Sequence, residues 1–325
     1  MTFMKAPDIT AVIVSYNTRD MTLECLRTLA RVAQPLSLET WVVDNASSDG
    51  SVEAIEQANL PDVQVIANLK NVGFGAANNQ AMWRARGEFI LLLNSDAFPD
   101  AGALQTLVEH LRGHPEVAAV GPRLRYADGT PQVSCYCFPT PLRAWIENLG
   151  LARFLARHPR WEDLAKWDHR TTREVDFVIG ACLLARRRAW EEVGGFDEGF
   201  FLYSEETDWQ RRMHNAGWRI AFTPDAGAVH VAGGSGAKDK VRINRHFFAS
   251  LDYYVRKHHG LAGLVSFRLA MTVGSFVRAL WWSCRSLFAG QRARAFAKAR
   301  LHWWLVFRQA TWPAPAVPRG AAYAA

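Results

Sequence analysis

Residues 9–17 read ITAVIVSYN, an apolar run that ends in three polar residues. A strand that is apolar on both faces predicts a place inside a parallel sheet, because helices cover both faces of such a sheet. Outward from this run, residues up to 125 alternate between apolar runs and segments of helical spacing. We therefore predict an α/β fold with a mainly parallel sheet flanked by helices. The predicted strands are 9–15, 39–43, 63–67, 89–93 and 117–120, and the predicted helices are 20–31, 51–58, 75–86 and 101–112.

The second half of the sequence is less regular. Residues 135–174 show no clear period, so this segment is either an insertion that acts as a lid or a loop held by aromatic packing. Regular patterns return at 176–230. There we predict a strand at 178–185, a helix at 187–193, a helix capped by Ser204, and closing strands at 219–223 and 227–231.

Composition limits the class of protein. The chain has 325 residues, 49% of them hydrophobic and 21% charged, which excludes a disordered chain. Its 5 cysteines are odd in number and unpatterned, so neither a disulfide framework nor a four-ligand zinc site is expected. No apolar run follows a basic cluster at the N-terminus, so we expect no secretory signal and a cytoplasmic location.

Charge divides the chain into two parts. From residue 238 onward there are 15 Lys or Arg and 2 acids, a net of +13 against +7 for the whole chain. Basic residues interleaved with tryptophans indicate either a nucleic-acid partner or an anionic membrane surface. Within the apolar segment 269–282, which Arg278 interrupts, the longest charge-free stretch is residues 269–277, shorter than the ~20 residues of a spanning helix. We predict interfacial helices at 267–288 and 296–307; the alternative is helices packed on the rest of the protein with a solvated basic face.

Polar clusters follow each of the first four predicted strands. Turn chemistry would explain any one cluster, because Asn, Asp and Gly favour turns. The carboxyl ends of parallel strands meet at one sheet edge, however, and ligands bind there. We therefore predict a ligand cleft lined by Ser15, Tyr16, Asn17, Asp44, Asn45, Asn71, Gly73, Asn78, Asn94, Ser95 and Asp96.

Three groups could carry chemistry. Asp96 follows a buried strand and could hold a divalent cation on phosphate oxygens, or simply cap the next helix. Glu205, Glu206 and Asp208 crowd the start of a helix, where they could supply a general base or only complement the helix dipole. His230 ends an apolar strand, where it is either structural or a helper of Asp96 at a metal.

The segment Gly73–Asn78 nearly matches the dinucleotide-binding pattern but ends in Asn and follows the third strand. This argues against a nicotinamide oxidoreductase.

Together these segments resemble family 2 glycosyltransferases of the GT-A fold. The resemblance spans Thr10–Ser235, with order and spacing preserved, and its branch is similar to bacterial rhamnosyltransferases that build lipid-linked polysaccharide. The motifs that carry it are VIVSYN at 12–17, VVDNAS at 42–47, NVGFGAANN at 71–79, LNSD at 93–96, GGFD at 194–197, FLY at 201–203, EETD at 205–208, and His230.

The resemblance implies an inverting transfer from a nucleotide sugar. Asp44 and the Ser15–Asn17 turn would bind the nucleoside, and the 71–79 loop the sugar-phosphate side. Asp96, helped by His230, would carry Mg²⁺ or Mn²⁺ on the diphosphate. Glu206 would be the general base, supported by Asp208. Two departures from the family pattern matter: Asn94 replaces a carboxylate, and Glu replaces Asp at 206, so Glu205 also remains a candidate base.

We accordingly expect a catalytic GT-A domain at 1–236, a basic, Trp-rich, membrane-associating helical region at 237–310 and a disordered tail at 311–325. The expected partners are a nucleotide-sugar donor, a glycan or polyprenyl-linked acceptor, and the inner leaflet of the plasma membrane. The donor candidates are dTDP-rhamnose, a UDP-sugar and a GDP-sugar, and the expected process is cell-surface polysaccharide synthesis. No nucleic acid is expected, and the oligomeric state stays open. The rival hypotheses are a nucleic-acid-binding protein acting through the basic tail and a catalytically inactive scaffold.

Overall fold

The computed structural model describes residues 6–155, 167–232, 240–288 and 292–315. Two compact units account for the chain. Unit 1 comprises residues 1–138 and 164–250 with 323–325, and unit 2 comprises 139–163 and 251–322. The expected boundary at residue 236 therefore lies inside unit 1, and part of the irregular middle segment belongs with the C-terminal helices.

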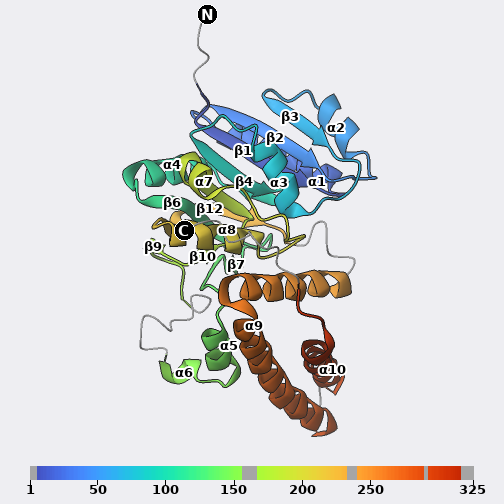
Figure 1. The fold of residues 1–325 in the computed structure, drawn as a ribbon. Helices are drawn as coiled ribbons and strands as arrows, with labels where there is room; N and C mark the ends of the chain where they lie inside the picture. The colour runs from blue at the N-terminus through green and yellow to red at the C-terminus, as the bar shows by residue number, and fades with distance from the viewer. Residues whose placement is uncertain (1–5, 156–166, 233–239, 289–291, 316–325) are drawn as a thin grey trace, which may run out of the picture. The chain divides into compact units, whose positions relative to one another are not determined.

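Unit 1 contains a mixed sheet whose larger part is parallel (Figure 1). Its main strand order is β3-β2-β1-β4-β11-β6-β12-β5, and β1 is paired in parallel with both β2 and β4. The antiparallel β11 lies between β4 and β6, and β5 pairs antiparallel with the end of β12. The strands are β1 Ile9–Ser15, β2 Leu38–Asp44, β3 Val63–Ala67, β4 Phe89–Asn94, β5 Ala97–Pro99, β6 Val117–Arg125, β11 Cys182–Arg186 and β12 Arg219–His230.

Short strands complete the sheets. β7 pairs with β6, β9 pairs with β12, and β8 and β10 form a separate two-stranded sheet. Their bounds are β7 Pro131–Gln132, β8 Cys135–Tyr136, β9 Arg173–Glu174 and β10 Phe177–Val178.

Helices cover both faces of the main sheet, as the apolar strands predict. On one face, Leu26 and Leu29 of α1 and Leu107 of α4 pack into the core. On the other, Met82 of α3 and Trp209 of α8 do so. The predicted α/β class and mainly parallel sheet are confirmed. The helices of unit 1 are α1 Arg19–Val32, α2 Ser51–Gln57, α3 Phe74–Met82, α4 Ala103–Gly113, α7 Arg187–Val193 and α8 Glu205–Asn215.

Several predicted boundaries are wrong, each for a local reason. The helix predicted at 75–86 ends at Met82, because the chain turns so that Gly87 can donate its N–H to Thr10 Oγ1 (2.8 Å). The strand predicted at 178–185 is broken, because the backbone of Val178 hydrogen-bonds the side chain of Gln210 instead of continuing into β11. The two closing strands are one strand, β12, with a register shift between Thr223 and Gly227.

Unit 2 is helical. It contains α5 Pro141–Asn148, α6 Ala152–Leu155, the part of α9 Lys240–Phe288 after residue 250, and α10 Arg292–Thr311. The predicted C-terminal helices are therefore present, although α9 is interrupted by a non-helical Gly260 (φ 68°). Residues 156–166, inside the predicted lid, and 316–325, in the predicted tail, lie outside the described residues.

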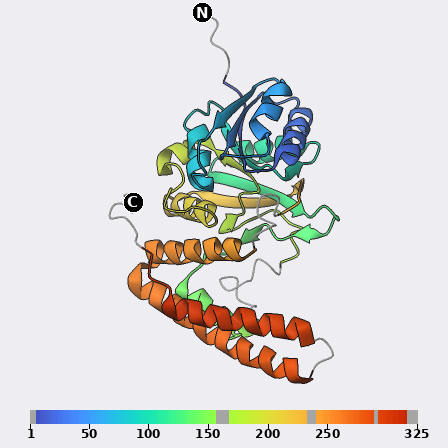
Figure 2. The ribbon, with the colours of Figure 1, turned by 90° about the vertical axis from the view of Figure 1, so that its right-hand side faces the viewer.

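A buried ion network joins the two long helices of unit 2. Asp252 accepts from Arg268 (2.8 Å) and Arg308 (3.0 Å), and Arg268 also donates to the carbonyl of Trp312 (2.8 Å). Further along the pair, Trp303 Nε1 donates to Ser283 Oγ (3.3 Å). Trp303 contacts Ser283, whereas the later Trp312 contacts the earlier Arg268. The two helices therefore run antiparallel (Figure 2).

The described part of α9, residues 243–287, is long and apolar enough to cross a membrane, judged by length and composition alone. Its best 18-residue window has a mean hydropathy of 1.5, and 28% of that window is buried. Charge does not exclude a spanning helix here, contrary to the sequence-based prediction, because at most two charged residues fall within the most apolar 18 residues. Length and composition do not distinguish a spanning helix from an interfacial one.

Candidate functional site

The loops after β1 and β2 are joined at the carboxyl edge of the sheet. The backbone N–H of Asn17 donates a hydrogen bond to Ser47 Oγ (2.8 Å). The side-chain Oδ1 of Asn17 accepts a hydrogen bond from the backbone N–H of Ser48 (2.8 Å). Asn45 N donates to the carbonyl of Ser15 (2.8 Å). The structure thus brings the first two polar clusters together, with Tyr16 half-buried between the exposed Asn17 and the buried Ser15.

Asp44 is the residue of this edge whose hydrogen bonding is incomplete. Its side chain is 2% exposed, and Oδ2 accepts from Ser47 N (2.8 Å). Oδ1 is buried and has no hydrogen-bond partner among the described residues. Because buried carboxylate oxygens are normally satisfied, this atom is suited to accept from an N–H or O–H group of a ligand.

Other predicted site residues bond the protein itself. Asn45 Nδ2 donates to Asn71 Oδ1 (3.0 Å) and to the carbonyl of Gly73 (3.2 Å), so it holds the loop after β3. Asn78 Nδ2 donates to the carbonyl of Phe74 one turn back (2.9 Å). Ser15 Oγ lies 3.0 Å from the Thr22 hydroxyl in a buried cluster of hydroxyl groups. In the same cluster the Thr18 hydroxyl lies 3.1 Å from the Ser95 hydroxyl. These side chains shape the edge rather than point hydrogen-bonding groups out of it.

Gly73 lies where the loop after β3 approaches the loop before α8. Its φ is +91°, and a Cβ there would lie 2.6 Å from the carbonyl oxygen of Phe201. That oxygen accepts the N–H of Phe74 (2.8 Å), so the two loops are fastened by backbone contact that leaves no room for a side chain.

We expect Gly73→Ala to lower the free energy of unfolding by about 3 kcal/mol and to weaken nucleotide binding, because the substitution combines strain with a backbone clash. Gly102→Ala is the matched control, since Gly102 has φ +78° but nothing within 4 Å of a Cβ; we expect about 1 kcal/mol there. Chemical denaturation and nucleotide calorimetry measure both effects. Equal losses for the two variants would contradict the close-contact argument.

Asp96 and His230 meet at the edge where β5 pairs with the end of β12. His230 Nε2 lies 3.3 Å from Asp96 Oδ1 and 3.4 Å from Asn94 Nδ2. His230 Nδ1 lies 3.1 Å from Gln132 Oε1, a neighbour that sequence reasoning missed because β7 is two residues long. Both Asp96 and His230 are less than a tenth exposed.

This donor set fits a divalent cation that keeps phosphate and water ligands. One carboxylate, one imidazole and the neighbouring amide of Asn94 are hard or borderline donors, which suit Mg²⁺ or Mn²⁺ bound largely through phosphates. Among the described residues, no three His, Cys, Asp or Glu side chains come together as a metal cage. Asp96 and His230 would supply two ligands to such a cation, and a bound diphosphate would supply others.

Glu205 and Glu206 open helix α8 after two residues of positive φ, Tyr203 (+71°) and Ser204 (+66°). The Ser204 side chain makes no capping hydrogen bond, so the predicted serine cap is wrong: the left-handed backbone turns the side chain away from the usual capping geometry. Glu205 is 3% exposed and packs against Gly75. Glu206 is half-buried beside Gly180, whose N–H lies 3.5 Å from Glu206 Oε1.

The two carboxyls affect each other's protonation. Burial raises the pKa of Glu205 well above its usual range, and the neighbouring charge of Glu206 raises it further. Burial also raises the pKa of Glu206. Oε2 of each is buried without a hydrogen-bond partner among the described residues. A half-buried carboxyl of raised pKa is suited to accept a proton, and Glu206 is the more accessible of the two.

Glu206 and Asp96 are connected through the broken strand. Gly180 contacts Glu206, and the next residue, Ala181, accepts the N–H of Asn94 (2.9 Å). Asn94 is two residues from Asp96 and borders His230. The acid pair and the Asp96–His230 pair therefore border one region of unit 1.

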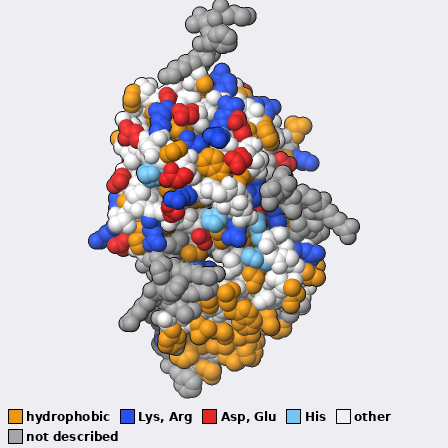
Figure 3. Space-filling view, turned by 60° about the vertical axis from the view of Figure 1, so that its left-hand side comes forward, with side chains coloured by type: hydrophobic (Ala, Val, Ile, Leu, Met, Phe, Trp, Pro, Cys, Tyr) orange, Lys and Arg blue, Asp and Glu red, His pale blue; other side chains and the backbone are white. Residues whose placement is uncertain are grey.

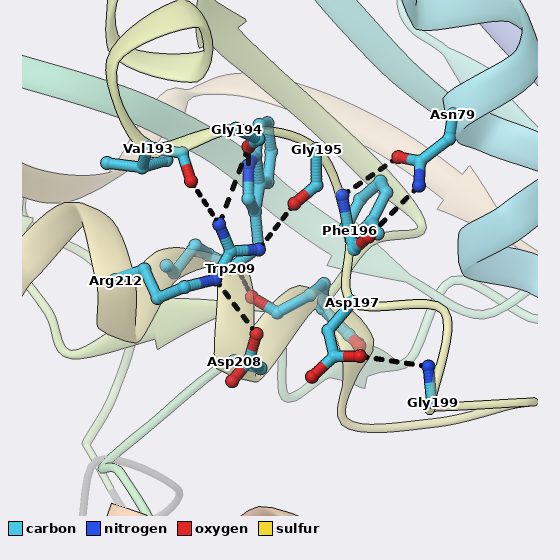
Figure 4. A network of polar contacts seen from close by, with 12 residues as sticks. Asn79, Val193, Gly194, Gly195, Phe196, Asp197, Gly199, Asp208, Trp209 and Arg212 are labelled. Atoms are coloured by element: carbon cyan, nitrogen blue, oxygen red, sulfur yellow. Dashed lines mark hydrogen bonds and ion pairs between the residues drawn. The ribbon is translucent and has the colours of Figure 1, made fainter. Parts of the chain in front are cut away.

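The Asp208 side chain points toward Arg212 (Figure 4). It is fully buried, and its Oδ2 lies 3.0 Å from Arg212 Nε. The Arg212 guanidinium donates onward to the carbonyls of Val193 and Gly195. This arrangement holds the loop that leads to α8; the catalytic support predicted for Asp208 stays a prediction.

Asn79 holds the same loop from the side of α3 (Figure 4). Its Oδ1 accepts from Phe196 N (2.8 Å), and its Nδ2 donates to Phe196 O (2.9 Å) and Glu198 Oε1 (3.0 Å). A side chain at Gly195 would meet Asn79 Oδ1 at 2.5 Å, so this position also needs glycine.

Comparison with known proteins identifies a family, several relatives and several solved structures of similar fold. Residues 10–194 match the family described as Glycosyl transferase family 2. The chain is 29% identical over 252 residues to an N-acetylglucosaminyl-diphospho-decaprenol L-rhamnosyltransferase of Mycobacterium tuberculosis, covering 71% of this chain and 81% of the relative. It is 24% identical over 290 residues to the low-salt glycan biosynthesis hexosyltransferase Agl10 of Haloferax volcanii, covering 86% and 85%.

Solved structures share the fold. The mannosyltransferase PcManGT from Pyrobaculum calidifontis, in complex with GDP-Man and Mn²⁺, has a TM-score of 0.57 at 20% identity, covering 94% of this chain and 85% of that one. GalNAc-T7 with UDP, GalNAc and Mn²⁺ has a TM-score of 0.55 at 13% identity, covering 96% and 59%. At these identities the likeness supports the GT-A fold and nothing more specific.

Proposed function

Because the chain belongs to glycosyl transferase family 2 and is therefore a glycosyltransferase, we propose that it transfers a sugar with inversion from a nucleotide-sugar donor to a lipid-linked glycan acceptor. The observation that carries this proposal is the arrangement at the sheet edge. The half-buried Glu206 contacts Gly180, and the adjoining Ala181 is hydrogen-bonded to Asn94 beside the Asp96–His230 pair. A proton acceptor and a phosphate-binding group are the two parts that such a transfer needs.

In this mechanism the buried Oδ1 of Asp44 accepts a hydrogen bond from the nucleoside, and the loops fixed by Asn45 enclose it. Asp96 and His230, with Asn94, would hold a divalent cation, which when bound neutralises the charge of the leaving diphosphate. The oxygen of the acceptor hydroxyl forms the new bond to the anomeric carbon of the donor sugar. Glu206 accepts the proton that this hydroxyl loses. The nucleoside diphosphate leaves from the opposite face, which inverts the configuration.

The mycobacterial rhamnosyltransferase that is 29% identical to this chain supports a specific choice of substrates. That relative is a rhamnosyltransferase that acts on a decaprenol-linked N-acetylglucosaminyl diphosphate. We propose dTDP-rhamnose as the donor and a polyprenyl-diphosphate sugar as the acceptor, within cell-surface polysaccharide synthesis. A UDP- or GDP-sugar on the same site is the alternative.

The test of function is a donor screen on the full chain in detergent. Nucleoside diphosphate release is followed from dTDP-rhamnose, UDP-sugars and GDP-sugars, with Mg²⁺, Mn²⁺ or EDTA and a polyprenyl-diphosphate-sugar acceptor. We expect turnover of one donor, abolished by EDTA. Turnover that survives EDTA would remove the cation from the mechanism, and absence of both turnover and nucleotide binding would refute the transferase.

The acceptor class makes a membrane partner a further part of the proposal. Residues 251–315 contain ten Lys or Arg and one acid, Asp252, which is buried. Figure 3 shows hydrophobic side chains gathered on the face formed by these helices. On α9, six exposed apolar side chains recur at intervals of four or seven residues, which places these six on one helix face. They are Leu261, Val265, Leu269, Phe276, Leu280 and Leu287.

We propose that this apolar face lies in the inner leaflet of the plasma membrane, with the basic residues near anionic headgroups. A nucleic-acid partner would use the basic residues but would leave the apolar face exposed to water, at a cost. The apolar face therefore favours the membrane.

Replacing Leu269, a member of this face that is 52% exposed, with Glu should weaken binding to phosphatidylglycerol vesicles at least tenfold, because a charge would enter the apolar layer. The control is Leu69→Glu, a fully exposed apolar residue of unit 1, which should bind as the wild type does. Vesicle flotation measures both. Equal binding by the two variants, or displacement of the protein from vesicles by duplex DNA, would contradict the membrane assignment.

A further inference from the structure

Four aromatic rings border the start of α8. Phe201 and Tyr203 lie in the loop that leads to Glu205 and Glu206, and His246 and Phe247 lie in the part of α9 that belongs to unit 1. The ring of Phe201 stacks on His246, with centroids 4.9 Å apart and planes at 25°. The ring of Tyr203 meets Phe247 edge-on at 5.9 Å. We call these four side chains the aromatic wall.

The backbone behind the aromatic wall is held on two sides. Ser250 Oγ donates to the carbonyl of Leu202 (2.7 Å), which fastens α9 to the loop. The carbonyl of Phe201 accepts the N–H of Phe74, which fastens the loop to α3. These contacts already attach α9, so the rings are not required for that purpose alone, and Phe247 keeps 43% of its surface exposed.

The aromatic wall is adjacent to the carboxyl that we propose as the base. Tyr203 comes three residues before Glu206, and its hydroxyl lies within electrostatic reach of both acids: burial raises the pKa of Tyr203, and the charges of Glu205 and Glu206 raise it further. A negatively charged group next to this acid pair would be repelled. The occupant of the aromatic wall is therefore expected to carry no negative charge.

A pyranose ring meets these requirements, because it carries no charge, has an apolar C–H face and offers a hydroxyl to Glu206. Aromatic rings offer flat apolar surface with few rotatable bonds, and the C–H face of a sugar packs on such a surface. We propose that the aromatic wall is the acceptor subsite, where the ring of the acceptor sugar stacks on Tyr203 and Phe247 and presents its hydroxyl to Glu206. This inference rests on the proposed transferase function and adds where its second substrate binds.

The test compares Phe247→Ala with the wild-type full chain in detergent. The probe is farnesyl-diphospho-N-acetylglucosamine, whose binding without donor is measured by calorimetry. We expect its Kd to rise about tenfold in the variant, while the Kd of the nucleotide-sugar donor changes less than twofold. Phe247→Tyr should restore acceptor affinity, because it keeps the ring. Phe296→Ala, which removes a 65% exposed ring on α10, is the control and should leave both affinities unchanged.

Repeating the experiment with farnesyl diphosphate, which lacks the sugar, separates sugar from lipid recognition. If Phe247→Ala weakens farnesyl diphosphate equally, the aromatic wall binds the prenyl chain and the inference is wrong. Unchanged acceptor affinity, or an equal loss of donor affinity, would also overturn it. Failure of the transferase would instead appear as wild-type protein that binds acceptor but turns over no donor, so the two failures are distinguishable.

Discussion

Replacing Glu206 with Gln is expected to lower kcat for sugar transfer about 10³-fold while the donor Kd stays within twofold of wild type. Gln keeps the size and polarity of the side chain but cannot accept a proton at neutral pH. The half-buried position beside Gly180 should accommodate Gln without a change of fold. Steady-state kinetics with a saturating acceptor and donor calorimetry measure the two quantities.

The pH dependence of wild-type kcat provides a second readout of the same group. Because burial raises the pKa of Glu206, its basic form is lost at a higher pH than for an ordinary glutamate. The rate should therefore fall as pH decreases through a value above the pKa of an ordinary glutamate, and be retained above that value. Glu205→Gln should leave this limb and most of kcat in place, because burial and the charge of Glu206 raise the pKa of Glu205 and favour its neutral form. A larger loss of kcat in Glu205→Gln than in Glu206→Gln would assign the base to Glu205.

Replacing Asp208 with Ala is expected to destabilise the protein by about 3–5 kcal/mol, because it leaves the Arg212 guanidinium buried without its carboxylate. Both side chains lie almost wholly inside the protein, with exposures of 0% and 8%. Arg212 also fastens the carbonyls of Val193 and Gly195, so the loop before α8 should loosen as well. Urea denaturation followed by far-UV circular dichroism gives the change.

The control is Asp100→Ala, which breaks a pair of the same chemistry at the surface. Asp100 and Arg125 are 2.6 Å apart, but each is more than a third exposed. We expect a loss below about 1 kcal/mol there, since water and salt screen such pairs. Similar losses for both substitutions would show that burial does not set the strength of the Asp208–Arg212 pair.

The parallel half of the sheet was predictable because its signals are local. Apolar runs such as 9–15 and 63–67 match β1 and β3 to the residue, and α7 was likewise predicted at 187–193. The missed strand β5 has three residues, too few for a period to show. The place of β11 between β4 and β6 depends on pairing with distant partners, which no local pattern contains.

The residue types of the candidate site were also predictable, but their directions were not. A strand-end position does not reveal that Asn45 bonds the Gly73 loop while Asp44 keeps an unpartnered oxygen. The same limit applies to Asp208, whose sequence position among acids suggests a shared role with Glu206, whereas its side chain pairs with Arg212. Side-chain direction follows from backbone geometry such as the positive φ of Tyr203 and Ser204, which were not visible in the pattern.

The late entry of β12 into the sheet has a consequence for synthesis on the ribosome. Asn94 and His230 are neighbours in space but 136 positions apart in the chain. A nascent chain that has emerged only as far as β6 carries Asp44 and Asp96 but neither Glu206 nor His230. Such a chain holds residues that we propose to bind the nucleotide, yet it lacks the proposed base and the proposed partner of Asp96. The proposed reaction centre is therefore complete only after translation has passed β12.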